Sequence, residues 1–179
     1  MDVSGLLEVI VMTLDYEIQA LCVAAGITRH LAYKQQYEGK TTKPNFKVRR
    51  HNLTPLQDVI DKANSAAAEC VVAFHQEIQG FYPKFDTFRE IADVGDNIEV
   101  KHTQGGKHLI IRPGDRNGAR DVAVLVTGFM PTYYIEGWMP LSMIRVDKYW
   151  RVDSWWVNKS DLFEMKTLAR SVYATRNSA

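Results

Sequence analysis

The segment from Ala92 to Thr103 constrains the fold of this chain more than any other. After Ala92 and Asp93 comes the turn-forming group Val94-Gly95-Asp96-Asn97, in which Gly95 can adopt a positive φ. From Ile98 to Thr103 apolar and polar residues alternate, which is the period of a strand with two different faces. The segment therefore predicts a tight hairpin that leads into a strand.

Charged residues around this hairpin predict a functional site. Glu99 and Lys101 are two residues apart on the predicted strand, so their side chains point to the same side. Closing the hairpin brings the carboxylate of Asp93 near that of Glu99. Two acids and a lysine at one point of a sheet suit a divalent metal ion and a phosphate group. Asp96, within the turn, is an alternative to Asp93 as the first acid.

Asp93 followed by Glu99-Val100-Lys101 resembles the core motif of the PD-(D/E)XK, or restriction-endonuclease-like, nuclease superfamily. Its proteins carry an Asp near one strand end and Glu-x-Lys or Asp-x-Lys on the neighbouring strand. From about Glu69 to Leu168 the chain is similar to small phage-type nucleases of this superfamily. The matching stretches are Ala68–Ala73, Asp93–Thr103, Val124–Gly128, Tyr134–Trp138 and Leu162. Ala92 departs from the family, which usually has Pro before its Asp, and the spacing from Asp93 to Glu99 is short.

The resemblance implies a role for each residue of the motif. Asp93, Glu99 and the backbone carbonyl of Val100 would bind Mg²⁺ or Mn²⁺, because these ions prefer hard oxygen ligands. Lys101 would orient the attacking water and offset charge at the phosphate. Glu69 resembles the acid that many superfamily members supply from their first core helix, and would bind a second metal ion.

Other residues are candidates for contact with the substrate or for acid–base roles. Thr103 and Gln104 follow the motif, where similar enzymes often contact the nucleic-acid backbone. Glu77 is a substitute for Glu69, one helical step away. His102 and His108 could act as acid or base groups, although strand histidines more often pack. The four tryptophans (Trp138, Trp150, Trp155, Trp156) could stack on bases, but packing is the expected role, above all for Trp138.

Helix and strand signals surround the motif. Thr54-Pro55-Leu56-Gln57 has the pattern of a capping box with proline at the first helical position, and it predicts one long helix that ends at Gly80. Apolar spacing predicts a helix from near Gly5 to Gly26 and a second one over Thr28–Gln36. Strands are predicted at Leu109–Arg112, Val122–Thr127 and Thr132–Trp138, and a last helix begins at Asn158. The aromatic groups Tyr149-Trp150 and Trp155-Trp156-Val157 form either an edge strand or a packed loop.

These elements predict an α+β fold with an α/β-like core. A mixed central sheet of about five strands would be flanked by helices, and the resemblance implies the restriction-endonuclease-like arrangement, with the long helix docked on the sheet beside the acids. The expected organisation is a helical N-terminal extension with a basic loop over residues 1–50, followed by a nuclease-like core domain over residues 51–179.

Charge is nearly balanced over the whole chain, at +1, which excludes a generally basic surface for nucleic acid. It is uneven along the chain, because residues 29–50 hold seven basic residues and one acid. Lys47, Arg49 and Arg50 in this segment are expected to contact DNA phosphates. The N-terminal helices are a candidate homodimer interface.

Cys22 and Cys70 each lie in an apolar helical stretch without a spacing partner, which indicates reduced thiols and a cytoplasmic protein. The apolar run from Leu6 to Leu14 is too short and too charged to span a membrane.

The function that the resemblance implies is a Mg²⁺-dependent DNA nuclease. Its expected location is the cytoplasm, that of the host cell if a phage encodes it. Two rivals stay open: a nuclease-like fold that binds nucleic acid or a host protein without cleavage, and a structural phage protein.

Overall fold

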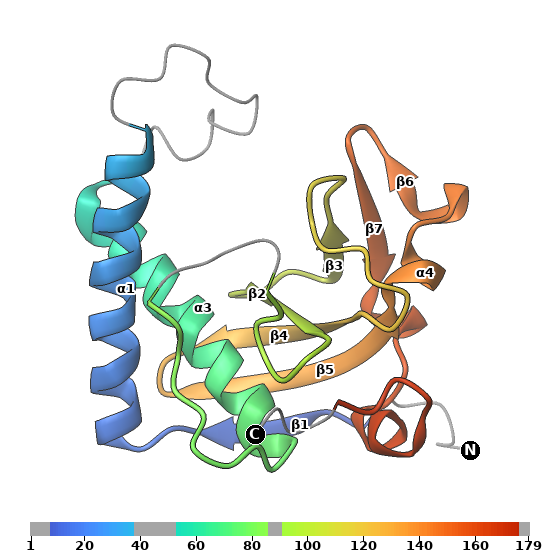
Figure 1. Ribbon diagram of the computed structural model, residues 1–179, viewed down its shortest axis with the longest axis horizontal. Helices are drawn as coiled ribbons and strands as arrows, with labels where there is room; N and C mark the ends of the chain where they lie inside the picture. The colour runs from blue at the N-terminus through green and yellow to red at the C-terminus, as the bar shows by residue number, and fades with distance from the viewer. Residues whose placement is uncertain (1–7, 38–52, 86–90, 176–179) are drawn as a thin grey trace.

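The computed structural model describes residues 8–37, 53–85 and 91–175, and it has an α+β architecture with two sheets and two long helices (Figure 1). Lys47, Arg49 and Arg50 lie outside the described residues. The helices are α1 (Tyr16–Tyr37), α3 (Pro55–His75) and the short α4 (Leu141–Ile144). The strands are β1 (Ile10–Thr13), β2 (Ile98–Thr103), β3 (His108–Ile111), β4 (Val122–Phe129), β5 (Thr132–Pro140), β6 (Trp150–Arg151) and β7 (Ser154–Asn158).

The main sheet is mixed, as expected, and its strand order is β1-β5-β4-β2. β2 runs parallel to β4, whereas β5 is antiparallel to both of its neighbours. The expectation of about five strands in one sheet is corrected, because β3 does not join this sheet. It pairs with β7 in a second sheet of three strands, in the order β3-β7-β6.

The central strand β4 is buried on both faces, as its continuous apolar run predicts. Val124 and Val126 pack on one side with α3, and Ala123 and Leu125 pack on the other side against the second sheet. The molecule therefore has two apolar cores, one on each face of the main sheet. β2 lies at the edge where both cores end.

Helix α3 begins as the capping box predicts. The Thr54 hydroxyl accepts a hydrogen bond from the Gln57 amide (3.3 Å), and the Gln57 side chain accepts one from the Thr54 amide (2.8 Å). Its alanine-rich face is buried against the main sheet, and the helix ends at His75 instead of Gly80.

The predicted N-terminal helices are wrong in two respects. Residues 10–13 form strand β1, which pairs with β5, and one continuous helix then runs through Gly26. Asp15 begins this helix, because its carboxylate accepts a hydrogen bond from the Ile18 amide (2.9 Å). Gly26 does not end the helix. It lies where α1 packs closely against α3, since a Cβ there would lie 2.7 Å from the Val59 carbonyl oxygen of α3.

The first described residues also belong to the same core as the rest of the chain. Leu14, Cys22 and Ala25 are buried together with α3 and the main sheet. β1 pairs with β5 at the edge of the main sheet, and α1 packs on α3 (Figure 1). None of the helices in the described ranges is long and apolar enough to cross a membrane.

The predicted last helix is also wrong. β7 ends at Asn158, and up to residue 175 the chain then forms two short 3-10 helices, Lys159–Asp161 and Met165–Arg170. Phe163 explains the interruption, because its backbone pairs with that of Trp138 through two hydrogen bonds (2.8 and 3.0 Å) and holds the chain extended. The apolar positions Leu162, Met165 and Leu168 are buried as expected, whereas Val172 is exposed.

Replacing Gly26 with alanine should destabilise the protein, although alanine favours helices. The new Cβ would collide with the backbone of α3 at Val59 and Ala63, and such overpacking typically costs about 1–3 kcal/mol. Urea unfolding followed by circular dichroism measures the change. The control is Ala24→Gly on the exposed face of the same helix, which should cost only about 1 kcal/mol from helix propensity. A Gly26→Ala protein more stable than wild type would contradict the close crossing of α1 and α3.

Candidate acidic site at the edge of the main sheet

The hairpin that precedes β2 forms as the sequence predicts. Val94 and Ile98 exchange two backbone hydrogen bonds (3.1 and 3.2 Å), and Gly95 between them has a φ of +59°. The hairpin fixes which way β2 faces. Ile98 and Val100 pack into the core with α3, so the side chains of Glu99 and Lys101 lie on the opposite face, over Ala123 and Leu125 of β4.

Asp93 lies at the outer edge of β2. One of its carboxylate oxygens (Oδ2) accepts a hydrogen bond from the Val100 amide (2.7 Å), on the side of the strand away from β4. A residue's N–H and C=O point to the same side of a strand, so the Val100 carbonyl faces this edge as well. The edge therefore presents carboxylate and carbonyl oxygens together.

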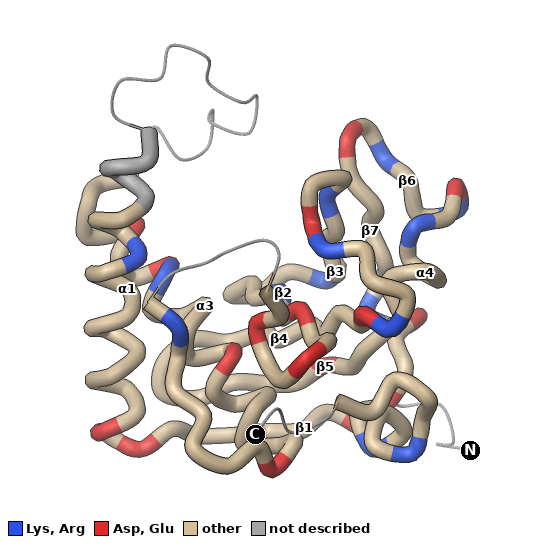
Figure 2. The backbone as a smooth tube through the Cα atoms, viewed as in Figure 1, with Lys and Arg blue, Asp and Glu red and all other residues tan. Residues whose placement is uncertain are grey.

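Lys101 is held between two carboxylates. Its Nζ lies 2.7 Å from Oε1 of Glu99 and 3.0 Å from Oδ2 of Asp115, which comes from the loop between β3 and β4. Burial lowers the pKa of Lys101, but the two carboxylates outweigh it, so the pKa is raised above its ordinary value. Figure 2 shows acidic positions on the turn into β2, and both acidic and basic positions on the loop after β3.

Glu69 reaches the same region from α3 and is 5% exposed. Both of its carboxylate oxygens are bound by the Arg29 guanidinium of α1 (2.8 and 2.7 Å). Arg29 also donates to the Lys84 carbonyl (2.7 Å), and the Lys84 ammonium donates to the Ala92 carbonyl (2.7 Å). These bonds connect both helices to the residue that precedes Asp93.

The three predicted acids lie within one another's electric field. Burial raises the pKa of Asp93 to about 8, and the charges of Glu99 and Glu69 add to the rise. Burial also raises the pKa of Glu69, against the opposing effect of Arg29. The acids therefore disfavour one another's ionised forms, and a bound cation would relieve this repulsion.

The donor chemistry of this edge fits Mg²⁺ or Mn²⁺, since carboxylate and carbonyl oxygens are their preferred ligands. Within the described ranges, however, no group of three or more His, Cys, Asp or Glu side chains is arranged to hold a metal ion. Glu69 is ion-paired with Arg29, and Glu99 is ion-paired with Lys101. A cation bound to the Glu99 carboxylate would therefore compete with the Lys101 ammonium.

The remaining predicted residues have other surroundings. Thr103, at the end of β2, accepts a hydrogen bond from the Gly106 amide (3.2 Å), and Gln104 is exposed in the next turn. Asp96 accepts a hydrogen bond from the Thr175 hydroxyl (3.0 Å), which ties it to the C-terminal segment. Glu77 lies beyond the end of α3, with a φ of +54°.

Both histidines have packing roles in the structure. A ring nitrogen (Nε2) of His102 lies 2.8 Å from the Gly128 carbonyl oxygen, and the ring packs edge-on against Tyr133. His108 packs in the same way against Trp156.

Trp138 is buried, as expected. The cysteines, which have no partner in sequence, meet in the core with their sulfur atoms 3.7 Å apart.

Sequence reasoning missed two residues of the site, Arg29 and Asp115. Arg29 lies within a helical pattern and has no local signal. Asp115 has one weak signal, the turn-forming stretch Pro113-Gly114-Asp115. Nothing in either stretch indicates that the two side chains reach Glu69 and Lys101, because both contacts join residues from separate elements.

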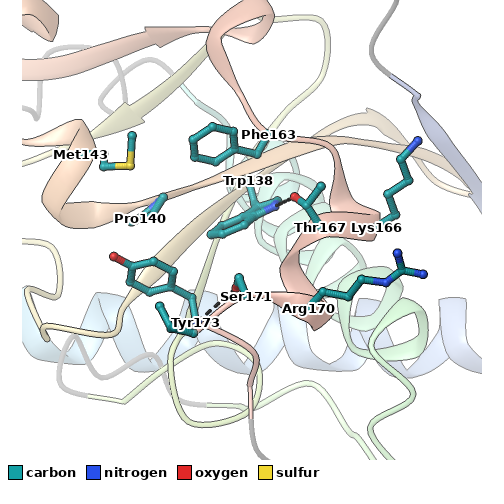
Figure 3. A pocket seen from close by; sticks show the side chains of 10 residues that line it. Trp138, Pro140, Met143, Phe163, Lys166, Thr167, Arg170, Ser171 and Tyr173 are labelled. Carbon is teal, nitrogen blue, oxygen red and sulfur yellow. Dashed lines mark hydrogen bonds between the residues drawn. The ribbon is translucent and has the colours of Figure 1, made fainter.

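A hollow with a volume of about 570 Å³ lies between β5 and the C-terminal segment (Figure 3). Its lining is mainly apolar and aromatic, and Lys166 and Arg170 are on it as well: Trp138, Pro140, Met143, Phe163, Lys166, Thr167, Arg170, Ser171, Val172, Tyr173. The indole N–H of Trp138 is occupied by the Glu164 carbonyl (3.1 Å) and the Thr167 hydroxyl (3.0 Å). None of the acids at β2 lines this hollow, so it is separate from the acidic site.

Comparison with known proteins gives no match for this chain, whether with protein-family models, curated proteins or solved structures.

The raised pKa of Asp93 makes stability depend on pH. Between about pH 4 and pH 8 the folded protein keeps a proton on Asp93, which an unfolded chain releases near the ordinary value of 3.8. The free energy of unfolding of the metal-free protein should therefore fall as the pH rises through this window, by up to about 1.4 kcal/mol per pH unit.

Urea unfolding at several pH values, with a chelator present, measures this slope. Asp93→Asn should flatten the slope relative to wild type, because asparagine has no proton to release. The control Asp147→Asn, at an exposed position, should leave the slope as it is. Equal slopes for wild type and Asp93→Asn would contradict the burial of an acid at this edge.

Proposed function

We propose that this protein is a metal-dependent nuclease of the PD-(D/E)XK type that hydrolyses DNA phosphodiester bonds. The observation that carries the proposal is that Asp93, Glu99 and Lys101 interact electrostatically at the edge strand β2, where Lys101 is ion-paired with Glu99. Glu69 adds its charge from α3. The α+β architecture supports a restriction-endonuclease-like fold, because a long helix covers a mixed sheet beside the acids (Figure 1).

Each residue has a role in this proposal. Asp93, Glu99 and the Val100 carbonyl would hold Mg²⁺ or Mn²⁺. The ion would supply charge stabilisation at the phosphate and a more acidic bound water. Lys101 would orient the attacking water and offset charge on the phosphoryl oxygens, for which a compact ammonium is well suited. Glu69 could serve a second ion only after releasing Arg29, so in the observed arrangement it acts through its charge.

DNA would approach the exposed side of β2. In Figure 1, α1 and α3 lie on one side of this strand and the second sheet on the other. Exposed basic residues close to β2, Lys107 and Arg112, could contact phosphates. Thr103 and Gln104 would lie beside the backbone of the bound strand. We also propose a cytoplasmic location, which agrees with the two free, buried cysteines.

One observation favours the rival function, binding of nucleic acid or a host protein without cleavage. Glu69 and Glu99 are both engaged by cations of the chain itself, and this arrangement neutralises the site without a metal ion. Metal-independent DNA binding that Glu99→Gln leaves unchanged would support this rival.

Activity on plasmid and linear DNA tests the nuclease proposal. With Mg²⁺ or Mn²⁺, wild type should cleave, whereas Glu99→Gln and Lys101→Ala should lose roughly 100-fold or more of the rate. The chain offers a matched control in Glu164 and Lys166, a second Glu-x-Lys sequence that is also ion-paired (2.8 Å) but lies outside the acidic site. Glu164→Gln and Lys166→Ala should cleave like wild type. Equal cleavage by wild type and Glu99→Gln would identify a contaminating nuclease and defeat the proposal.

We further propose that two copies associate through α1. The outer face of this helix exposes Val23, Ile27 and Leu31, which are 42%, 46% and 53% exposed and four residues apart. Such a stripe is the pattern by which amphipathic helices pair. Light scattering after gel filtration should show a dimer for wild type and a monomer for Ile27→Glu. Val172→Glu, at an exposed apolar position elsewhere, is the control. A monomeric wild-type protein at all concentrations would contradict this interface.

A further inference from the structure

Asp115 contacts the lysine of the site from outside the motif. The loop between β3 and β4 carries it to Lys101, and its side chain is 14% exposed. Lys101 therefore has one partner on its own strand, Glu99, and one partner from a separate segment. When the site binds a cation, Glu99 would contact the ion, whereas Asp115 could keep its contact with Lys101.

The Asp115 carboxylate is fixed independently of β2. Its Oδ2 accepts a hydrogen bond from the Arg112 amide (2.9 Å), and the Asp115 amide donates to the Arg112 carbonyl (3.0 Å). Arg145 holds the same loop by donating to the carbonyls of Asp115 (2.8 Å) and Arg116 (2.6 Å). The Arg145 guanidinium in turn lies over the Trp155 ring of β7. Asp115 is thus anchored to the second sheet.

Glu99 cannot hold Lys101 and a metal ion equally well. Its carboxylate bonds the ammonium through Oε1, and a divalent ion at the same group would repel that ammonium. Once Glu99 turns to the ion, Asp115 is the carboxylate that still holds Lys101. A fixed second partner is what keeps a long, flexible lysine side chain in one place.

We propose that Asp115 is a positioning residue, which holds the Lys101 ammonium at the phosphate while Glu99 binds the metal ion. This inference rests on the nuclease activity proposed above. It extends the site from one strand edge to the second sheet, so that the loop after β3 determines where Lys101 lies. Without Asp115, the ammonium would return to Glu99 and compete with the ion.

The test is a set of steady-state rates on DNA with Mn²⁺. Asp115→Asn keeps an oxygen that can accept the Arg112 hydrogen bond but removes the charge that holds Lys101. It should lower kcat roughly 10–100-fold and change KM for DNA less than about threefold. Asp115→Glu should recover part of the lost rate. The control Asp161→Asn removes the carboxylate beside Lys148 and should leave kcat unchanged.

A double-mutant cycle separates positioning from a general structural effect. Because Asp115 acts through Lys101, adding Asp115→Asn to Lys101→Ala should change the remaining rate less than about twofold. Circular dichroism melting of each variant checks folding, and Asp115→Ser, which also removes the charge, serves in place of Asp115→Asn if the latter unfolds.

The outcomes distinguish this inference from the proposed function. Wild type that neither cleaves DNA nor binds Mn²⁺ by calorimetry overturns the nuclease and Asp115's role together. An active wild type with full activity in Asp115→Asn overturns the role of Asp115 alone. A further large loss in the Lys101→Ala background overturns it as well, because the effect would then not pass through Lys101.

Discussion

The parallel pairing of β2 with the buried strand β4 is the constraint on which the acidic site depends. Its register sets Ile98 opposite Val122 and Lys101 opposite Leu125, so the apolar side chains of β2 enter the core under α3 and its charged ones lie on the opposite face of the sheet. A slip by one residue would exchange the two faces. Glu99 and Lys101 would then enter an apolar core without partners, at a cost of several kcal/mol each. The register of β2 against β4 therefore determines whether Glu99 and Lys101 can form the site.

Charge balance at this edge is the second constraint. Glu69, Asp93, Glu99 and Asp115 come from four segments, while Arg29 and Lys101 are the cations that pair directly with members of this group. Arg29 fully occupies Glu69, whereas Lys101 is shared between two acids. Asp93 accepts a hydrogen bond from the Val100 amide, and burial raises its pKa to about 8. Within the described ranges, Asp93 is thus the member of this group that has no ion pair of its own, and it lies at the edge of β2.

The helix α1 connects this charge balance to the fold. Arg29 lies one turn beyond Gly26, the residue that lets α1 pack closely on α3. A looser crossing of the two helices would move the guanidinium away from Glu69 and leave a buried carboxylate without its partner. The N-terminal segment therefore contributes to the site, although the motif itself lies wholly in the later part of the chain.

Several elements followed from the sequence because their signals are local. The capping box before α3, the Gly95 turn and the alternation along β2 each depend on residues within a few positions, and each was confirmed. The shared side of Glu99 and Lys101 follows from strand geometry alone. The α+β class and the mixed main sheet follow from the order of such elements.

The errors occurred where distant contacts outweigh local preference. Residues 10–13 have a helical spacing but form a strand, because β5 offers an edge to pair with. The residues after Asn158 have a helical stripe, but the pairing of Phe163 with Trp138 keeps them extended. Gly26 has the usual character of a helix stop, yet the helix continues, because only glycine fits against α3 at that point.

The spacing of Glu99 and Lys101 is enough to predict that their side chains share one face of a strand. Their surroundings could not be predicted, because they depend on how separate elements pack. Arg29 and Asp115 reach the site across 40 residues and 14 residues of chain, respectively, through α1 and through the loop after β3. Such contacts arise when separate elements pack together, and no local pattern of residues encodes them.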